Sequence, residues 1–186
     1  FLNAGWSEKK VKVVPLGIDY ESLLNSKKTD SFDDEKFNFL NISIPHYRKN
    51  IDVVIEAYYK AFQKESNVRL ILKTSLAEPK NSFECFVPKI IHDIQKKLNF
   101  SNFPCLTLVT ERYENMGSLY KASDCLLSAT GSEGFGLPML ESMASETLVA
   151  STSVTGHKDF VNSKNAVIIP SKKIKADKRH QYWRPS

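Results

Sequence analysis

Long apolar stretches are absent from this 186-residue sequence, because no run approaches the roughly 18 residues that a membrane-spanning helix needs. Cysteines are few: Cys85, Cys105 and Cys125 are odd in number and lack the spacing of a metal site. No signal peptide, internal repeat or low-complexity tract is visible. These absences exclude a transmembrane protein, a disulfide-stabilised miniprotein and a repeat protein. We expect the three cysteines to be reduced and buried, as in a cytosolic protein.

The composition that is present is typical of a folded globular domain. Hydrophobic residues make up 41% of the chain and charged residues 25%, and a domain of this length can bury roughly 70% of its unfolded surface. The 26 basic and 21 acidic residues leave a net charge of +5, which suits an anionic partner or is a solvated surface only. Much of the excess lies in residues 171–180, which lack interleaved aromatic residues and RNA-binding motifs. We therefore expect no nucleic-acid partner.

Short β-rich runs alternate with helical patterns along the chain. This alternation predicts right-handed crossovers and an α/β fold, a doubly wound, Rossmann-like parallel sheet with helices on both faces. Ligands of such sheets bind at the carboxyl ends of the strands. The predicted strands are residues 11–14, 37–42, 68–72, 106–109, 125–127, 148–150 and 166–169; the predicted helices are residues 51–62 after an N-cap at Asn50, 87–98, a turn around 116–120, one from about Pro138 and one near Asp159.

One loop between a predicted strand and a predicted helix carries two glycines and two glutamates. Gly134 and Gly136 let the backbone turn tightly and approach a ligand. The free amides at the start of the following helix favour a phosphate or a developing anion. Glu133 and Glu141 suit the hydroxyls of a sugar or ribose, because carboxylates accept hydrogen bonds and repel phosphates. For an isolated loop, a solvated glycine-rich turn is the simpler interpretation.

The complete string is more specific. Residues 133–141, Glu-Gly-Phe-Gly-Leu-Pro-Met-Leu-Glu, resemble the E-x7-E signature, in its EGFGLPxLE form, of retaining nucleotide-sugar glycosyltransferases of family 4. These enzymes have the GT-B architecture of two Rossmann-like domains. Residues 14–19, 48–52 and 119–124 also resemble segments of the C-terminal domain in this family. Together the resemblance covers most of residues 10–170.

The resemblance implies a division of the chain and a partner domain. Residues 1–13 would be a linker, residues 14–170 the nucleotide-sugar-binding Rossmann-like domain, and residues 171–186 a basic segment leading towards an N-terminal, acceptor-binding domain that this sequence lacks. The chain starts at Phe1 rather than Met. We therefore expect it to be one domain of a longer, two-domain enzyme, able to bind a donor but not to complete the reaction alone.

The resemblance also implies roles for individual residues. In this family the second glutamate of the motif holds the donor ribose, which gives that role to Glu141. The first contacts the hydroxyls of the transferred sugar, which makes Glu133 a catalytic residue. The basic segment neutralises the diphosphate, which implies Lys49 as a second catalytic residue and Arg48 as a donor contact. The loop amides that face the sugar and diphosphate would belong to Gly134, Phe135, Gly136 and Leu137.

The sequence departs from the family pattern at two informative places. Ser43-Ile44-Pro45 stands where relatives carry a Gly-Arg or Gly-Ser pair, so the upstream phosphate-binding arginine has no counterpart and Arg48 is the candidate substitute. Lys73 stands where many relatives have a glycine pair, and is a further candidate for phosphate or acceptor contact. The four histidines show no nucleophile pattern and are interpreted as structural or surface residues.

The leading hypothesis is the donor-binding domain of a retaining glycosyltransferase of hexosyl-transferring type, acting in the cytoplasm without a metal ion or other cofactor. A catalytically inactive binding module of the same fold is an alternative, motivated by the missing arginine. A phosphorylase-type relative is another. The basic segment from Lys172 could dock on anionic lipid at the cytoplasmic membrane surface, or form a connection back to the absent domain, which we prefer.

Overall fold

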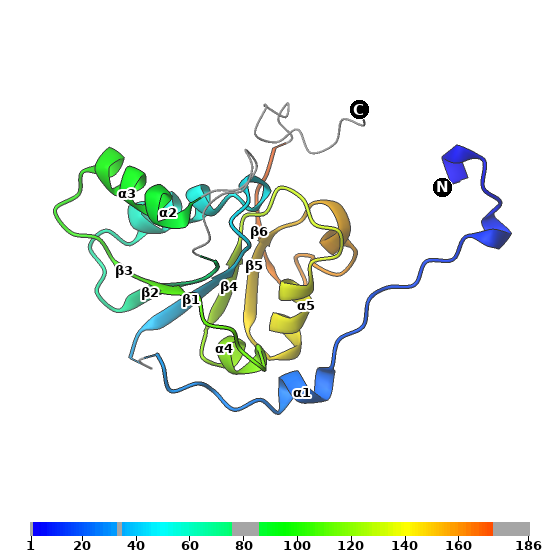
Figure 1. Ribbon diagram of the computed structural model, residues 1–186, viewed down its shortest axis with the longest axis horizontal. Helices are drawn as coiled ribbons and strands as arrows, with labels where there is room; N and C mark the ends of the chain where they lie inside the picture. The colour runs from blue at the N-terminus through cyan, green and yellow to red at the C-terminus, as the bar shows by residue number, and fades with distance from the viewer. Residues whose placement is uncertain (1, 33–34, 76–85, 173–186) are drawn as a thin grey trace.

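The computed structural model describes residues 2–32, 35–75 and 86–172, and its centre is a six-stranded sheet (Figure 1). Every neighbouring pair of strands in this sheet is parallel. The strand order is β3-β2-β1-β4-β5-β6, so the predicted doubly wound α/β class is confirmed. The strands are β1 (Phe37–Ile42), β2 (Val68–Lys73), β3 (Cys105–Val109), β4 (Cys125–Ser128), β5 (Leu148–Thr152) and β6 (Val167–Ile169).

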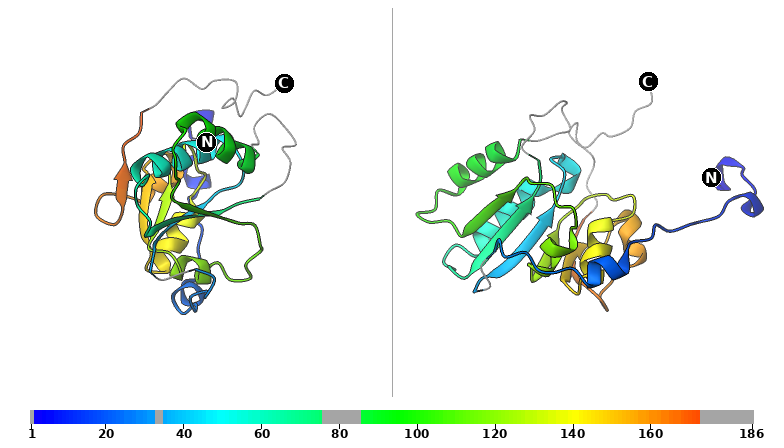
Figure 2. Two further views of the ribbon diagram at one scale, coloured as in Figure 1. Left: turned by 90° about the vertical axis from the view of Figure 1, so that its left-hand side faces the viewer. Right: turned by 60° about the horizontal axis from the view of Figure 1, so that its bottom comes forward.

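Helices cover both faces of the sheet, as Figure 2 shows from two further sides. Two of them, α2 and α3, pack together on one face, and α1, α4 and α5 form a group on the other. No helix among the described residues is long and apolar enough to cross a membrane. The helices are α1 (Tyr20–Leu24), α2 (Ile51–Ala61), α3 (Val87–Leu98), α4 (Gly117–Lys121) and α5 (Leu137–Ala144), and the 3-10 turns are η1 (Leu2–Ala4), η2 (Glu8–Lys10), η3 (Tyr47–Lys49) and η4 (Thr155–Asp159).

Alternation of side chains along the strands gives the sheet two separate cores. In β2, Ile71 belongs to the core under α1, α4 and α5, whereas its neighbours Leu70 and Leu72 belong to the core under α2 and α3. Successive side chains of a strand point to opposite faces, and all three are fully buried. Strands that are buried on both faces read as continuous apolar runs, which is the pattern of residues 68–72 in the sequence.

The predicted strand at residues 11–14 is wrong. Residues 11–19 have no regular structure, and residues 2–16 extend away from the sheet as an arm (Figure 1). Val13 and Val14 are 92% and 83% exposed. Branched side chains favour a strand only where a neighbouring strand and a buried face receive them, and this segment has neither within the described sheet.

The structure bears on the predicted cysteines and on the helix near Asp159, but not on most of the C-terminal segment. Cys125 is buried as predicted, but Cys105 is exposed because it opens the edge strand β3, and Cys85 lies outside the described residues. Residues 173–186, most of the basic C-terminal segment, also lie outside the described part of the chain. The helix expected near Asp159 is the 3-10 turn η4.

The fold generates a stability prediction. Leu40 in the central strand β1 is completely buried, whereas Leu148 at the start of β5 is 48% exposed. We expect Leu40→Ala to lower the free energy of unfolding by about 2–5 kcal/mol, because it leaves a cavity in the core. Leu148→Ala is the matched control and should change it by less than about 0.5 kcal/mol. Urea unfolding measures both, and equal losses would contradict the assigned core.

Candidate functional site

The strand order reverses between β1 and β4, the two central strands of the sheet. At such a reversal the connections after the two strands lead to opposite sides, and this opens a ligand crevice at their carboxyl ends. The segment after β1 carries Arg48 and Lys49 in η3, and the segment after β4 is the loop with Glu133. We call Arg48 and Lys49 the basic segment and residues 129–136, between β4 and α5, the acidic loop. The sheet therefore brings both to the same edge, the one formed by the carboxyl ends of the strands.

Three of the predicted site residues contact one another at this edge. Lys49 Nζ lies 2.5 Å from Glu133 Oε1, and Arg48 Nη1 lies 3.2 Å from Glu133 Oε2. Only 10% of the Lys49 side chain and 8% of the Glu133 side chain are exposed. Arg48 Nη1 also donates to the carbonyl oxygen of Ser132, at 2.6 Å. The two carboxylate oxygens of Glu133 thus each receive a cationic donor, although 84 residues separate Lys49 from Glu133 along the chain.

Backbone contacts fix the basic segment against the acidic loop. The Gly131 amide donates to the Arg48 carbonyl at 2.8 Å. The Asn50 side chain donates to the Ala129 carbonyl at 2.8 Å, and it makes no cap bond to α2 although Asn50 holds the N-cap position. Asn50 adopts a left-handed conformation with φ of 50°, which asparagine tolerates better than most residues. Asn50 is therefore the N-cap of α2 by position, as predicted, but its side-chain amide bonds the neighbouring loop instead of the helix.

The environment of Glu133 keeps its carboxylate charged. Burial alone would raise its pKa, but the hydrogen bond and charge of Lys49, the Thr130 hydroxyl and the charge of Arg48 oppose this. The net result is a pKa below the ordinary value of 4.5. Glu133 is therefore an ionised acceptor at neutral pH and suits hydroxyl donors rather than the role of a proton donor.

Glu141 lies in the second turn of α5 and is held by a tyrosine that sequence reasoning did not assign to the site. Tyr120 Oη, from α4, donates to Glu141 Oε2 at 2.7 Å. Tyr120 is completely buried. Burial, and then the negative charge of Glu141, raise the pKa of Tyr120, so its hydroxyl keeps its proton and remains a donor. From the sequence, Tyr120 is predicted only as an apolar position of a short helical turn.

Of the two glycines in the predicted motif, only Gly136 is required by the local structure. Gly136 has φ of 98°, and an added Cβ there would lie 2.6 Å from His157 Cβ, so glycine is required by both conformation and packing. An added Cβ on Gly134 would meet nothing within 4 Å. The Phe135 ring packs on Phe160 at a centroid distance of 5.3 Å. Leu137, the first residue of α5, is 37% exposed, so the start of this helix opens to solvent.

Lys73, the remaining predicted contact, is the last residue of β2 and pairs in register with Ile42 of β1. It therefore lies at the same edge of the sheet, and its side chain is partly buried. Among the described contacts, none joins its ammonium group to Glu133 or Glu141. No three His, Cys, Asp or Glu side chains of the described residues come together as ligands for a metal ion.

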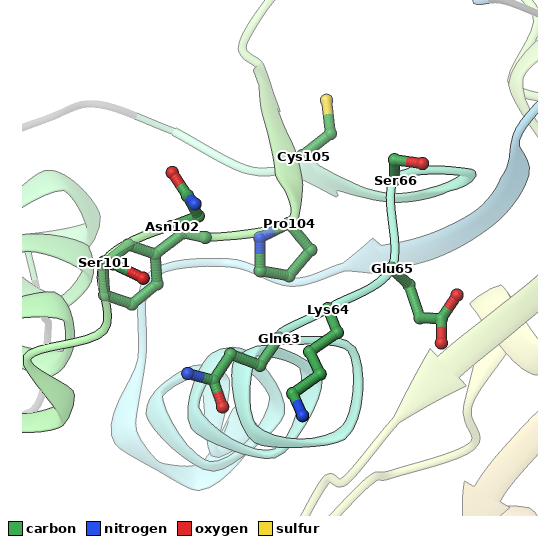
Figure 3. A pocket seen from close by; sticks show the side chains of 9 residues that line it. Gln63, Lys64, Glu65, Ser66, Ser101, Asn102, Pro104 and Cys105 are labelled. Carbon is green, nitrogen blue, oxygen red and sulfur yellow. The ribbon is translucent and has the colours of Figure 1, made fainter.

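Figure 3 shows a pocket at the opposite edge of the sheet. Ser66 precedes β2 there, and Cys105 begins β3, so this hollow faces the amino ends of the strands. Cys105, which lines the hollow, accepts a hydrogen bond at its carbonyl from Tyr58 Oη of α2, at 2.7 Å. None of the predicted site residues lines it.

The fold and the edge with its basic and acidic side chains define an α/β domain of the Rossmann-like class, with its ligand crevice between β1 and β4. The sequence model of the family "Glycosyl transferases group 1" matches residues 37–178. The chain therefore belongs to the group 1 glycosyl transferases, and it has the fold of a C-terminal GT-B domain.

Individual relatives agree with this family. An uncharacterized glycosyltransferase of Sulfolobus islandicus rod-shaped virus 1 is 26% identical over 140 residues, which are 74% of this chain and 38% of the viral protein. The chain thus spans about two fifths of that relative. The C-terminal domain of a group 1 glycosyl transferase from Francisella tularensis, LpcC, superposes with a TM-score of 0.63 at 20% identity, covering 84% of this chain and 81% of that domain.

A second solved structure has the same fold. HepE of Anabaena, determined in complex with UDP-glucose, superposes with a TM-score of 0.65 at 19% identity. The match covers 90% of this chain and 46% of HepE.

The buried ion pair generates a pH-dependent stability prediction. We expect Lys49→Met to lower the free energy of unfolding by about 3 kcal/mol at pH 7, because it leaves the Glu133 carboxylate buried with only Arg48 as a cationic partner. The lowered pKa of Glu133 contributes stability above the ordinary pKa, and this contribution is lost as the pH falls through the folded-state value. The difference between the variant and the wild type should therefore shrink below about pH 4.5.

Lys60→Met is the matched control, because Lys60 forms an exposed pair with Glu56 at i and i+4. It should change stability by less than about 0.5 kcal/mol. Urea unfolding of the three proteins at pH 7 and pH 3.5 makes the comparison. A Lys49→Met loss that is independent of pH would contradict the ion pair as its cause.

Proposed function

We propose that this chain is the donor-binding domain of a retaining, metal-independent glycosyltransferase, which transfers a hexose from a nucleoside-diphosphate sugar to an acceptor. The observation that carries the proposal is the convergence of Lys49 and Glu133 at the β1/β4 crevice. Glu141 lies in α5, the helix that follows the loop with Glu133. Membership of the group 1 family supports the reaction class. Fold neighbours determined with UDP-glucose, or with UDP and GlcNAc, support the donor class.

The cations of the crevice suit a diphosphate. When the bond between the sugar and the phosphate breaks, the leaving diphosphate gains negative charge, and fixed cations and amides stabilise that charge without rearranging. Lys49 and Arg48 supply the cations in our proposal, and the loop amides from Gly134 to Leu137 supply hydrogen-bond donors at the start of α5. Lys73, at the same edge, is a further candidate contact. In this proposal protein cations fill the role that a metal ion has in other transferases.

The carboxylates suit hydroxyl groups. Glu133 is ionised and fixed by two cations, so it can accept hydrogen bonds from hydroxyls of the transferred sugar without a change in protonation. Glu141, oriented by Tyr120, can accept from the ribose of the nucleotide. A charged acceptor binds a hydroxyl more strongly than a neutral one, and this divides the donor into a sugar end at Glu133 and a nucleoside end at Glu141.

Transfer itself requires an acceptor, which we assign to a separate N-terminal domain. The chain spans 38% of its viral relative, so it leaves room in a protein of that kind for a domain of similar size. We therefore propose that the 186-residue chain alone binds the donor and does not complete the transfer.

Nucleotide binding tests the proposal. Isothermal titration of this chain with UDP, GDP and ADP, and with their hexose derivatives, should give binding for one base series. Lys49→Met should weaken the nucleoside diphosphate by about tenfold or more, the effect of losing one charged contact, and leave the nucleoside alone unchanged. Glu141→Ala should weaken nucleoside and nucleotide alike.

Lys60→Met is the control here also, since Lys60 lies in the last turn of α2 and pairs with Glu56 of the same helix. It should leave every affinity unchanged. No binding of any nucleotide or nucleotide sugar by the wild-type chain would overturn the proposal. Binding that is unaffected by both Lys49→Met and Glu141→Ala would place the nucleotide elsewhere.

A further inference from the structure

A turn that belongs to neither motif lies directly against the acidic loop. It comprises residues 153–159, follows β5 and includes η4, and we refer to it as the β5 turn. Its Thr155 Oγ1 accepts a hydrogen bond from the Glu133 amide at 2.8 Å, and its Gly156 amide donates to the Glu133 carbonyl at 3.1 Å. Both backbone polar groups of Glu133 are therefore bonded to two consecutive residues of this turn.

We propose that Thr155 is a positioning residue for Glu133. A residue whose own amide and carbonyl are both held has little freedom in its two backbone dihedrals, and these dihedrals set the direction of the bond from Cα to Cβ. The Thr155 hydroxyl and the Gly156 amide thus direct the Glu133 side chain towards Lys49 and the crevice. The inference rests on the proposed function, because it gives the Glu133 carboxylate the hydroxyls of the transferred sugar as its ligand.

The β5 turn is itself anchored, so it can act as a support. His157 is completely buried, and its Nε2 lies 2.5 Å from the carbonyl oxygen of Thr152 at the end of β5. Thr152 Oγ1 in turn donates to the Thr130 carbonyl at 2.6 Å, at the base of the acidic loop. The turn and the loop are therefore hydrogen-bonded to each other where they leave β5 and β4, as well as at Glu133.

The β5 turn and the acidic loop pack closely against each other. A Cβ added to Gly156 would lie 2.0 Å from the Gly134 carbonyl oxygen, and one added to Gly136 would lie 2.6 Å from His157 Cβ. The first contact is with a backbone oxygen and the second with the Cβ of a buried side chain, so neither can be relieved by moving the far end of a flexible side chain. The backbones of the turn and of the acidic loop approach as closely as glycine permits.

The conformation of Thr155 supports a role beyond packing. Its φ is 56°, in the left-handed region, where a β-branched residue is strained and glycine is the usual occupant. The side chain is exposed, so burial does not explain why a threonine occupies this position. The Thr155 hydroxyl, which accepts from the Glu133 amide, explains the threonine. A glycine would relieve the backbone strain but would lose this acceptor.

Two substitutions at Thr155 separate the hydroxyl from the rest of the side chain. Thr155→Val keeps the shape and the strain but removes the acceptor, whereas Thr155→Ser keeps the acceptor. Ser153→Ala is the matched control, because Ser153 carries a hydroxyl in the same turn that donates to the Val161 carbonyl and not to Glu133. Both positions are partly or fully exposed, so the three variants should fold as the wild type does.

The first measurement uses the 186-residue chain without a ligand. NMR should show the Glu133 amide proton of Thr155→Val moving upfield and exchanging with water about tenfold faster, because its hydrogen bond is lost. Thr155→Ser and Ser153→Ala should stay within about twofold of the wild type. An unchanged Glu133 amide in Thr155→Val overturns the positioning role.

The second measurement compares two ligands, the nucleoside diphosphate and the corresponding nucleotide sugar of the base that the chain binds. Thr155→Val should weaken the nucleotide sugar about fivefold to tenfold and leave the nucleoside diphosphate within about twofold, with Thr155→Ser restoring the affinity. Equal affinities of Thr155→Val and wild type for the sugar overturn the inference. A wild-type chain that binds neither ligand contradicts the proposed function instead, and the amide measurement still decides whether Thr155 positions Glu133.

Discussion

The buried carboxylate of Glu133 is the constraint around which this edge of the domain is organised. A charge with only 8% of its side chain exposed is stable only with a cationic partner and hydrogen bonds. Lys49 provides that partner from the segment after β1, and Arg48 adds a second contact. Because β1 and β4 are the two strands between which the sheet order reverses, this one ion pair ties together the two walls of the crevice.

In our proposal, the same interaction prepares the crevice for an anionic, hydroxyl-bearing ligand. Lys49 and Arg48 are already held by Glu133 without a phosphate. The Glu133 carboxylate is already ionised without a hydroxyl ligand, so donor binding requires little rearrangement. The buried Tyr120 hydroxyl likewise donates a hydrogen bond to one carboxylate oxygen of Glu141 and fixes its orientation. Membership of the group 1 glycosyl transferases gives this arrangement a reaction class, and the proposed donor divides between the two glutamates.

The strands of the sheet could be predicted from sequence because apolar runs buried on both faces are distinctive, whereas the ligand contacts of Glu133 and Glu141 stay predictions. The strand predicted at Val13 and Val14 is wrong because β-propensity carries no information about whether a partner strand is present. The side-chain bond of Asn50 and the support from Thr155 could not be predicted, because both depend on a loop distant in sequence. The sequence predicts the β5 turn only as a short helix near Asp159, and nothing in it indicates the contact with Glu133.

A crystal structure of this chain with the nucleotide sugar that it binds tests the central claim most directly. The account expects the diphosphate within about 3 Å of Lys49 Nζ, with the sugar hydroxyls on Glu133 and the ribose on Glu141. A nucleotide sugar seated away from the β1/β4 crevice, for example in the hollow between Ser66 and Cys105 at the opposite edge of the sheet, would contradict it.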